Sequence, residues 1–244
     1  MINSVVLDLD GTLLNENMEI SEANKRALKQ LDALKVPYFI ATGRPEQLAK
    51  PVVSELRYDR PMIMYNGSVI GHPFKDERLY GERIEPENIK DIVQFCKHHD
   101  MIVMLYTKDA IYSDPNYRVD FFEERNADLP TCDRAVFKSM DDFDSAYEVN
   151  KILIIEHTES KRSQFKHHFE NTPALDDALS IVQSQPAFMD INPKGTSKGY
   201  AISVLFERLG LNPHHSLAIG DQENDISMKD HTGTFVAMEN ATDA

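Results

Sequence analysis

The sequence predicts an α/β fold in which both ends of the chain build a parallel-sheet core and a smaller domain is inserted between them. Three observations lead to this prediction. Strand-like and helix-like segments alternate over the first third of the chain, and the same alternation returns near residue 197. Such alternation is typical of a parallel sheet with helical crossovers. The middle of the chain has a different order of segments, which indicates a separate α+β domain.

Local patterns place the elements of the core. Ser21 is a suitable N-cap for an amphipathic helix, Pro45 suits the start of a second helix, and Gly210 suits the end of the last. Apolar runs mark the strands. We expect core strands at residues 3–9, 37–43, 62–65, 216–220 and 233–238. We expect core helices at residues 21–35, 45–56 and 197–209.

The Asn66-Gly67 pair between apolar runs predicts a hairpin turn after the third strand. The inserted domain is expected at 83–186, which assigns 1–82 and 187–244 to the core. Its expected helices are 86–99, 116–126 and 160–170, and its expected strands are 101–106, 110–113, 151–157 and 179–184. A strand at 187–191 is expected to pair with the last of these.

Composition limits the classes of partner. The net charge is −14, with 26 basic and 40 acidic residues, so we expect neither nucleic acid nor an anionic membrane as a partner. The start of the chain has no signal-peptide pattern, and the two cysteines have no metal-ligand spacing. We therefore expect a cytoplasmic protein with free thiols, either a monomer or a homodimer.

Residues whose side chains could act in catalysis or bind a ligand lie where core strands are expected to end. Asp8 and Asp10 follow the first strand, and positions two apart face the same way in an extended chain. Thr42, Gly43 and Arg44 follow the second strand. Lys198 opens a helix, and Asp221, Asn224 and Asp225 follow the last buried strand. Ligands of open parallel sheets bind beyond these strand ends, so one site is expected there.

Four motifs carry a family resemblance. DLDGTLL, ATGR, KGTSKG and GDQENDISM, in this order, resemble the motifs of phosphatases of the haloacid dehalogenase (HAD) superfamily, in its Cof-type branch with a type IIB cap. The resemblance covers essentially the whole chain. It implies a Rossmann-like parallel-sheet core with an inserted α+β cap domain that determines substrate specificity.

The resemblance also implies catalytic roles. Asp8 would be the nucleophile that forms an aspartyl phosphate, and Asp10 would act as general acid and then base, starting protonated. Lys198, rather than Lys194, would offset the charge between Asp8 and the phosphate. From the residues alone, Asp8 could instead cap a turn or pair with a lysine, and Asp10 could bind a metal through its side chain.

A Mg²⁺ site is expected from the same residues. The resemblance implies three direct ligands for the ion: the side chain of Asp8, the side chain of Asp221 and the backbone carbonyl of Asp10. Asn224 and Asp225 would be supporting ligands. Oxygen ligands of this kind suit Mg²⁺. The alternative for this last cluster is an acidic first turn of a helix with Asp221 as its N-cap.

The substrate phosphate is expected near Thr42, Gly43, Arg44, Asn66 and Lys198. A hydroxyl and backbone N–H groups at a helix start can bind phosphate. Thr42 could also serve only as an N-cap, Arg44 only as a solvated rim residue, and Asn66 only as a turn residue.

We therefore expect a Mg²⁺-dependent phosphatase that hydrolyses a small phosphorylated metabolite, most simply a sugar phosphate. A phosphotransferase or phosphomutase with the same intermediate is the alternative enzyme, and a non-catalytic binding or regulatory module is the alternative of another class. Relatives usually continue beyond the strand at 233–238 and carry a glycine where this chain has Glu239. We expect the chemistry to survive this difference and the sheet edge to be less well covered.

Overall fold

The computed structural model describes residues 2–114 and 135–242. The chain divides into two compact units, which we treat separately. The core unit comprises Met1–Gly81 and Thr196–Ala244, and the inserted unit comprises Glu82–Gly195. The helix expected at 116–126 lies outside the described residues.

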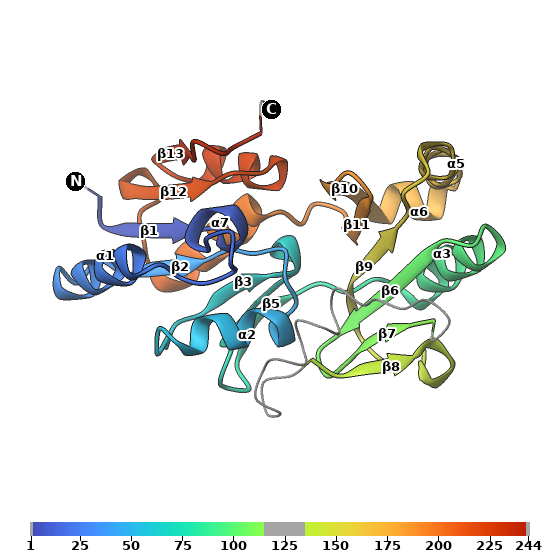
Figure 1. Ribbon diagram of the computed structural model, residues 1–244, viewed down its shortest axis with the longest axis horizontal. Coiled ribbons are helices and arrows are strands. Elements are labelled where there is room, and N and C mark those ends of the chain that lie inside the picture. Colours follow the sequence, from blue (N-terminus) through green and yellow to red (C-terminus); the bar gives the residue numbers. More distant parts are fainter. Residues whose placement is uncertain (1, 115–134, 243–244) are drawn as a thin grey trace. The chain divides into compact units, whose positions relative to one another are not determined.

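The core unit is built on a parallel sheet, as expected. Its strand order is β13-β12-β1-β2, and every neighbouring pair is parallel. Strands from opposite ends of the chain therefore lie side by side (Figure 1). The strands are β1 (Ser4–Leu7), β2 (Tyr38–Ile40), β12 (Ser216–Gly220) and β13 (Thr234–Ala237).

A parallel bridge between Ala41 and Ile63 leads from this sheet to an antiparallel sheet of order β3-β4-β5. The hairpin expected at Asn66-Gly67 is confirmed, because β3 and β4 pair antiparallel around it. The hairpin implies a strand after the turn, whose bounds were not predicted, and the next strand, β5, was not expected. The three strands are β3 (Met62–Met64), β4 (Val69–Gly71) and β5 (Arg78–Gly81).

Helix α7 (Lys198–Leu209) is fixed to the core sheet by its apolar face. Four of its side chains lie in one buried cluster with residues of β1, β2 and β12; they are Ala201, Ile202, Leu205 and Phe206. Burial of a large apolar side chain contributes about 1.5–3 kcal/mol, so this face holds the helix firmly. The side chain of Ser197 caps the helix by accepting from Tyr200 N–H. The position of Lys198 is thereby determined.

The remaining helical segments of the core unit connect its strands. They are α1 (Glu22–Ala33), α2 (Glu46–Ser54), the turns η1 (Leu9–Leu13) and η2 (Tyr65–Gly67), η5 (Pro213–His215) and η6 (Glu223–His231). The first strand is shorter than expected, since β1 ends at Leu7. Asp8 therefore follows the strand and Asp10 belongs to the turn η1, so the alternation rule of an extended strand does not apply to this pair.

The inserted unit has a six-stranded sheet of order β10-β11-β9-β6-β7-β8. Its helices pack on one face, where they share a buried cluster with alternate residues of the strands, such as Ile152 and Ile154. The strands are β6 (Ile102–Thr107), β7 (Ile111–Ser113), β8 (Phe137–Ser139), β9 (Val149–Ile155), β10 (Leu179–Gln185) and β11 (Phe188–Pro193). The helical segments are α3 (Pro86–His98), η4 (Met140–Asp142), α5 (Glu159–Glu170) and α6 (Pro173–Ala178).

One boundary of the expected division needs correction. Residues from 187 onward were expected in the core, but the inserted unit extends to Gly195. The reason is hydrogen bonding: β11 pairs antiparallel with both β10 and β9, so its backbone groups are satisfied within the inserted sheet.

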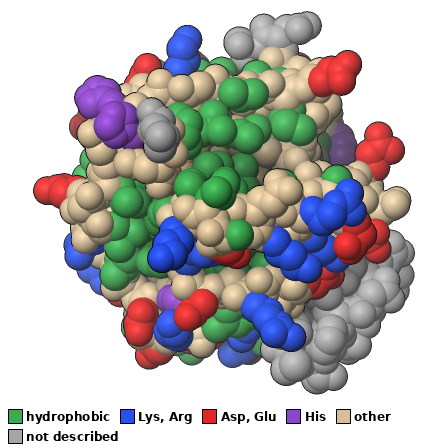
Figure 2. Space-filling view, turned by 90° about the vertical axis from the view of Figure 1, so that its left-hand side faces the viewer, with side chains coloured by type: hydrophobic (Ala, Val, Ile, Leu, Met, Phe, Trp, Pro, Cys, Tyr) green, Lys and Arg blue, Asp and Glu red, His purple; other side chains and the backbone are tan. Residues whose placement is uncertain are grey.

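The outer strand of the core sheet is β13. It pairs with β12 alone among the described strands, and Val236 on it is 44% exposed. Figure 2 shows hydrophobic side chains gathered across one face of the molecule, bordered by charged ones.

None of the described helices combines the length and apolar character needed to cross a bilayer.

Candidate active site

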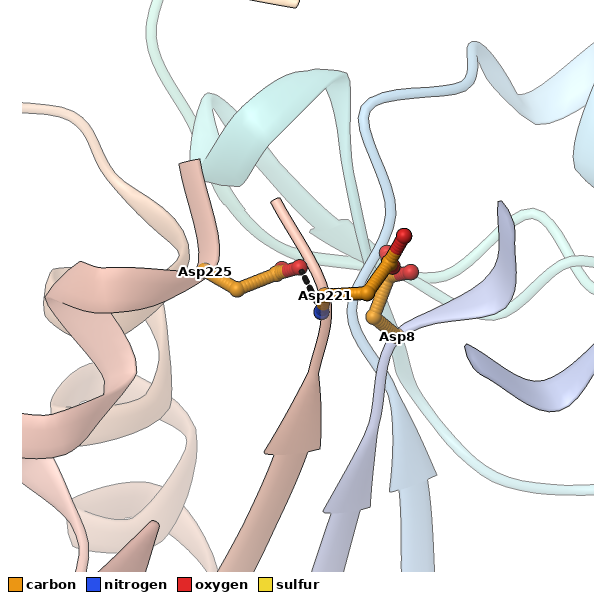
Figure 3. A group of neighbouring side chains, drawn as sticks. All are labelled: Asp8, Asp221 and Asp225. Atoms are coloured by element: carbon orange, nitrogen blue, oxygen red, sulfur yellow. Dashed lines mark hydrogen bonds between the residues drawn. The ribbon is translucent and has the colours of Figure 1, made fainter. Parts of the chain in front are cut away.

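The candidate active site lies at the carboxyl ends of two neighbouring parallel strands. Asp8 directly follows β1 and Asp221 directly follows β12. The register pairs Leu7 with Ile219, so the strand ends bring both carboxylates to one edge of the sheet. Figure 3 shows these side chains close together, while Asp225 reaches toward them from η6. One carboxylate oxygen from each of the three aspartates lies within 4.8 Å of the others.

Lys198 bridges two of these aspartates. Its Nζ lies 2.6 Å from Asp8 Oδ1 and 2.6 Å from Asp225 Oδ1. The ammonium group is enclosed, since Lys198 is 1% exposed. Lys194, in contrast, is exposed and its Nζ donates to the Asp176 carbonyl. Of the two lysines in KGTSKG, the structure therefore brings Lys198 to the acidic cluster.

Asp225 holds the loop that carries Asp221. Its Oδ2 accepts hydrogen bonds from the backbone N–H groups of Asp221 and Gln222, each at 3.0 Å. Gln222 is the N-cap of η6 and forms a reciprocal capping box with Asp225. The suggestion that Asp221 caps this segment is therefore wrong. Both oxygens of Asp225 are engaged, one by Lys198 and the other by the loop.

The electrostatics of the cluster suit a divalent cation. Asp8, Asp221 and Asp225 are buried carboxylates, and in residues 2–114 and 135–242 only the Lys198 ammonium pairs with any of them. Two negative charges are therefore uncompensated when all three carboxylates are ionised. Burial raises the pKa of Asp8 from 3.8 to about 7, against the opposing effect of Lys198. The ion pairs with Asp8 and Asp225 outweigh burial and raise the pKa of Lys198. A cation bound by these oxygen donors would stabilise ionised Asp8.

Asp10 has a different environment from Asp8. Its two carboxylate oxygens accept hydrogen bonds from Arg44, Nε to Oδ2 at 2.8 Å and Nη2 to Oδ1 at 2.5 Å. The Asp10 side chain is 45% exposed and that of Arg44 is 18% exposed. Arg44 is thus not simply a solvated rim residue. The resemblance implies that Asp10 starts protonated, and the structure shows both of its carboxylate oxygens engaged by Arg44 in a bidentate pair.

The loop after β2 brings Thr42 and Gly43 to the same edge of the sheet. Thr42 is fully buried, and its Oγ1 accepts from Arg44 N–H at 3.1 Å. Helix α2 has Pro45 as its N-cap, so the suggestion that Thr42 caps that helix is wrong. The Asn224 side chain is held by Asn66 from the β3–β4 turn: Asn224 Nδ2 donates to Asn66 Oδ1 at 3.0 Å.

Three side chains around Asp221 were missed by the sequence analysis. Thr12 Oγ1 donates to Asp221 Oδ1 at 3.0 Å, and Gln222 Nε2 donates to Oδ2 at 3.0 Å. Asn240, which follows β13, donates to the same Oδ2 at 3.3 Å and to the Gly11 carbonyl at 3.0 Å. Thr12 and Gln222 lie within the motifs DLDGTLL and GDQENDISM and could have been suspected. Asn240 is far from them in sequence, and only the strand order brings it near.

The protonation of Asp8 predicts a pH dependence of stability. In the presence of EDTA, raising the pH from about 5 to about 8 is expected to lower the melting temperature of the wild type more than that of Asp8→Asn. The pKa of Asp8 is higher in the folded protein than in the unfolded chain, so this group's contribution is lost as the pH rises toward about 7. Thermal melts of both proteins across this range test it. Equal pH slopes would contradict the assignment of a raised pKa to Asp8.

With the geometry established, comparison with known proteins identifies the family. The family model described as haloacid dehalogenase-like hydrolase matches residues 5–244, nearly the whole chain. The chain belongs to the haloacid dehalogenase-like hydrolase family. Its relatives include several named phosphatases, and together these findings make the chain an enzyme, a hydrolase of the phosphatase kind. The resemblance stated from the four motifs is confirmed, as is the α/β fold class.

Three matches illustrate the range of the family. A pyridoxal phosphate phosphatase of Escherichia coli is 28% identical, over 98% of this chain and 89% of its own. A 5-amino-6-(5-phospho-D-ribitylamino)uracil phosphatase of Bacillus subtilis is 27% identical, over 98% and 88%. The solved structure of a HAD subclass IIB sugar phosphatase is 26% identical with a TM-score of 0.81, over 98% and 88%.

One further relative is a longer protein. The chain is 26% identical to a chloroplastic endoribonuclease of Arabidopsis thaliana, of which it spans 42%. That name describes the whole of the longer protein, and the matched part is less than half of it.

Proposed function

We propose that this HAD-family phosphatase hydrolyses a small phosphomonoester, a sugar phosphate in the first instance, through an aspartyl-phosphate intermediate on Asp8. The observation that carries the proposal is the buried Asp8–Lys198–Asp225 bridge at the strand ends, with Asp221 beside it. The likeness to a sugar phosphatase supports the substrate class. The other two named relatives act on different small phosphate esters, which supports the wider class of phosphomonoesters.

The first step is phosphoryl transfer to Asp8. Lys198 engages Oδ1 of Asp8, and Oδ2 has no hydrogen-bond partner among the described residues, so Oδ2 is available for attack. A bond forms between this oxygen and phosphorus while the ester P–O bond breaks. Asp10 gives a proton to the departing alkoxide, which leaves as an alcohol. Water then attacks phosphorus, Asp10 takes its proton, and inorganic phosphate is released.

Arg44 has to leave Asp10 before this proton transfer. Its guanidinium occupies both oxygens of Asp10 without substrate. A phosphate ester is a competing bidentate acceptor for the same guanidinium. We therefore propose that substrate draws Arg44 to the phosphate, and that the freed Asp10 carboxylate takes up a proton from solvent, which it then donates to the departing alkoxide.

Mg²⁺ is the proposed cofactor, and the donor set fits it. Asp8, Asp221 and the Asp10 carbonyl would hold the ion, with Asp225 and Asn224 supporting their loop. Among the described residues, the buried Asn224 Oδ1 has no hydrogen-bond partner, which is consistent with a further ligand or water at this edge. When bound, Mg²⁺ supplies charge stabilisation to the phosphoryl oxygens.

A substrate panel tests the proposal directly. Inorganic phosphate release is measured with Mg²⁺ and with EDTA, for sugar phosphates, pyridoxal phosphate and flavin phosphates. We expect Mg²⁺-dependent release, greatest for a sugar phosphate. Loss of the ester without release of phosphate would indicate a phosphotransferase or mutase instead. No turnover of any ester would favour the non-catalytic alternative.

Asn240→Ala is expected to weaken Mg²⁺ binding about tenfold, since removal of a group that orients a metal ligand has effects of this order. Asn240 Nδ2 ties Asp221 Oδ2 to the Gly11 carbonyl, so its loss loosens a proposed ligand. The Mg²⁺ concentration for half-maximal stabilisation in thermal melts provides the measurement. Asn17→Ala, an exposed asparagine of the same unit, is the control. An unchanged Mg²⁺ titration for Asn240→Ala would refute this role.

A further inference from the structure

The turn between β3 and β4 has an unusual backbone. Tyr65, Asn66 and Gly67 have φ values of +52°, +57° and +102°, three left-handed residues in succession. All three are buried, and Tyr65 is only 1% exposed. Glycine adopts this conformation without cost, whereas a bulky residue such as tyrosine does so only where its surroundings require it. Residues with such sparsely populated backbone conformations cluster at functional sites, and this turn contacts three segments of the candidate active site.

The turn first holds the loop after β2. Tyr65 N–H donates to the Arg44 carbonyl and Asn66 N–H donates to the Thr42 carbonyl, each at 3.1 Å. The fit is close, because a Cβ added at Gly43 would lie 2.6 Å from Asn66 Oδ1. The backbone of Thr42–Arg44 therefore takes its position from this turn.

The turn also touches the start of α7. A Cβ added at Gly67 would lie 2.1 Å from the Ser197 carbonyl oxygen, so only glycine fits here. Ser68 Oγ is 3.4 Å from Thr196 Oγ1. Because Ser197 is the N-cap of α7, these contacts fix the position of Lys198, the first residue of the helix.

The third contact is made by the side chain of Asn66. Its Oδ1 accepts a hydrogen bond from Asn224 Nδ2 at 3.0 Å. Asn224 lies in η6 next to Asp225, the residue that pairs with Lys198 and holds the Asp221 loop. One turn thus connects three segments: the Thr42 loop, the start of α7 and η6.

We propose that the turn Tyr65–Gly67 is a positioning element of the active site, and that Asn66 acts through Asn224 instead of touching substrate. The turn sets the Thr42 loop, Lys198 and Asp225 relative to one another. This inference rests on the proposed phosphatase function, which it deepens. Asn66 was expected near the substrate phosphate, and its hydrogen bond to Asn224 favours a different role.

Asn66→Gly tests this role, because glycine adopts φ +57° freely and only the amide is lost. We expect kcat to fall about tenfold or more at saturating Mg²⁺ and saturating substrate, because Lys198 and Asp225 are displaced from Asp8. KM is expected to rise as well, since the same turn holds the loop that carries Arg44. The matched control is Lys35→Gly, an exposed residue after α1 that also has φ +57°. Its kcat should equal that of the wild type. A loss confined to KM in Asn66→Gly would overturn the proposal.

Asn224→Ala breaks the same hydrogen bond from the other side and leaves the turn itself intact. We expect its kcat to fall as well. The kcat of the double variant with Asn66→Gly should be no lower than that of the less active single variant. Unchanged kcat in Asn224→Ala, or additive losses in the double variant, would overturn the proposal.

Hydrogen exchange gives a readout that needs no turnover. In Asn66→Gly, backbone amides of residues 42–48 and 222–228 should exchange faster than in the wild type, while those of 28–36 should not change. Unchanged exchange in the first two segments would overturn the inference even if every phosphoester proved inert. Conversely, a normal Asn66→Gly enzyme beside an inactive Asp8→Asn enzyme would sink this inference and leave the proposed function standing.

Discussion

Asp8→Asn is expected to reduce phosphate release by on the order of 10⁴-fold or more, because loss of the nucleophile removes the covalent route. Asn keeps an oxygen that can accept from Lys198, so the Asp225 pair and the surrounding packing are retained. The fold should therefore survive, and a normal melting temperature would attribute the loss to chemistry. Steady-state phosphate release is the measurement.

Trapping the intermediate strengthens this test. Acid-quenched wild-type enzyme with substrate should show a mass increase of one phosphoryl group, and the Asp8→Asn variant should not. Asp230→Asn serves as the matched control, because Asp230 is an exposed aspartate of η6 outside the site. If Asp8→Asn kept more than a tenth of wild-type turnover, Asp8 would not be the nucleophile.

Lys198→Met is expected to be costly for stability as well as for activity. Removal of one partner of a buried ion pair costs about 3–5 kcal/mol, and Lys198 serves two buried carboxylates, those of Asp8 and Asp225. For a chain of this size, that corresponds to a fall in melting temperature of about 10 °C. Turnover at a permissive temperature should fall by on the order of 10²–10³-fold, as for loss of a preorganised charge donor.

Mg²⁺ should partly offset this loss of stability. Without Lys198, no side-chain cation of the described part of the chain pairs with the three carboxylates, so added Mg²⁺ should raise the melting temperature of Lys198→Met more than that of the wild type. Lys194→Met is the control, an exposed lysine of the same motif, and its stability should change by less than about 0.5 kcal/mol. A Lys198→Met protein that melts with the control would contradict the bridging role of Lys198.

The fold class and most core elements could be predicted from local patterns. The first strand, the helix capped by Ser21 and the helix ended by Gly210 are all visible in the sequence, because caps and apolar periodicity act over a few residues. The end of that strand at Leu7 is not visible there, since the apolar pattern continues to Leu9. The bounds of β4 and the whole of β5 were missed, since three or four residues carry little pattern. The boundary near residue 187 was wrong because strand pairing joins residues that are distant along the chain.

The same division holds for the site. The sequence by itself determined the family, the acidic character of the site and the choice of Asp8, Lys198 and Asp221, since these residue types adjoin strand ends and recognisable motifs. Only the tertiary structure decided their partners. That Arg44 grips Asp10, that Asn66 meets Asn224 and that Asn240 reaches Asp221 depends on contacts between segments far apart in sequence. Local sequence sets which groups are present, whereas long-range packing sets which of them meet and which charge is offset.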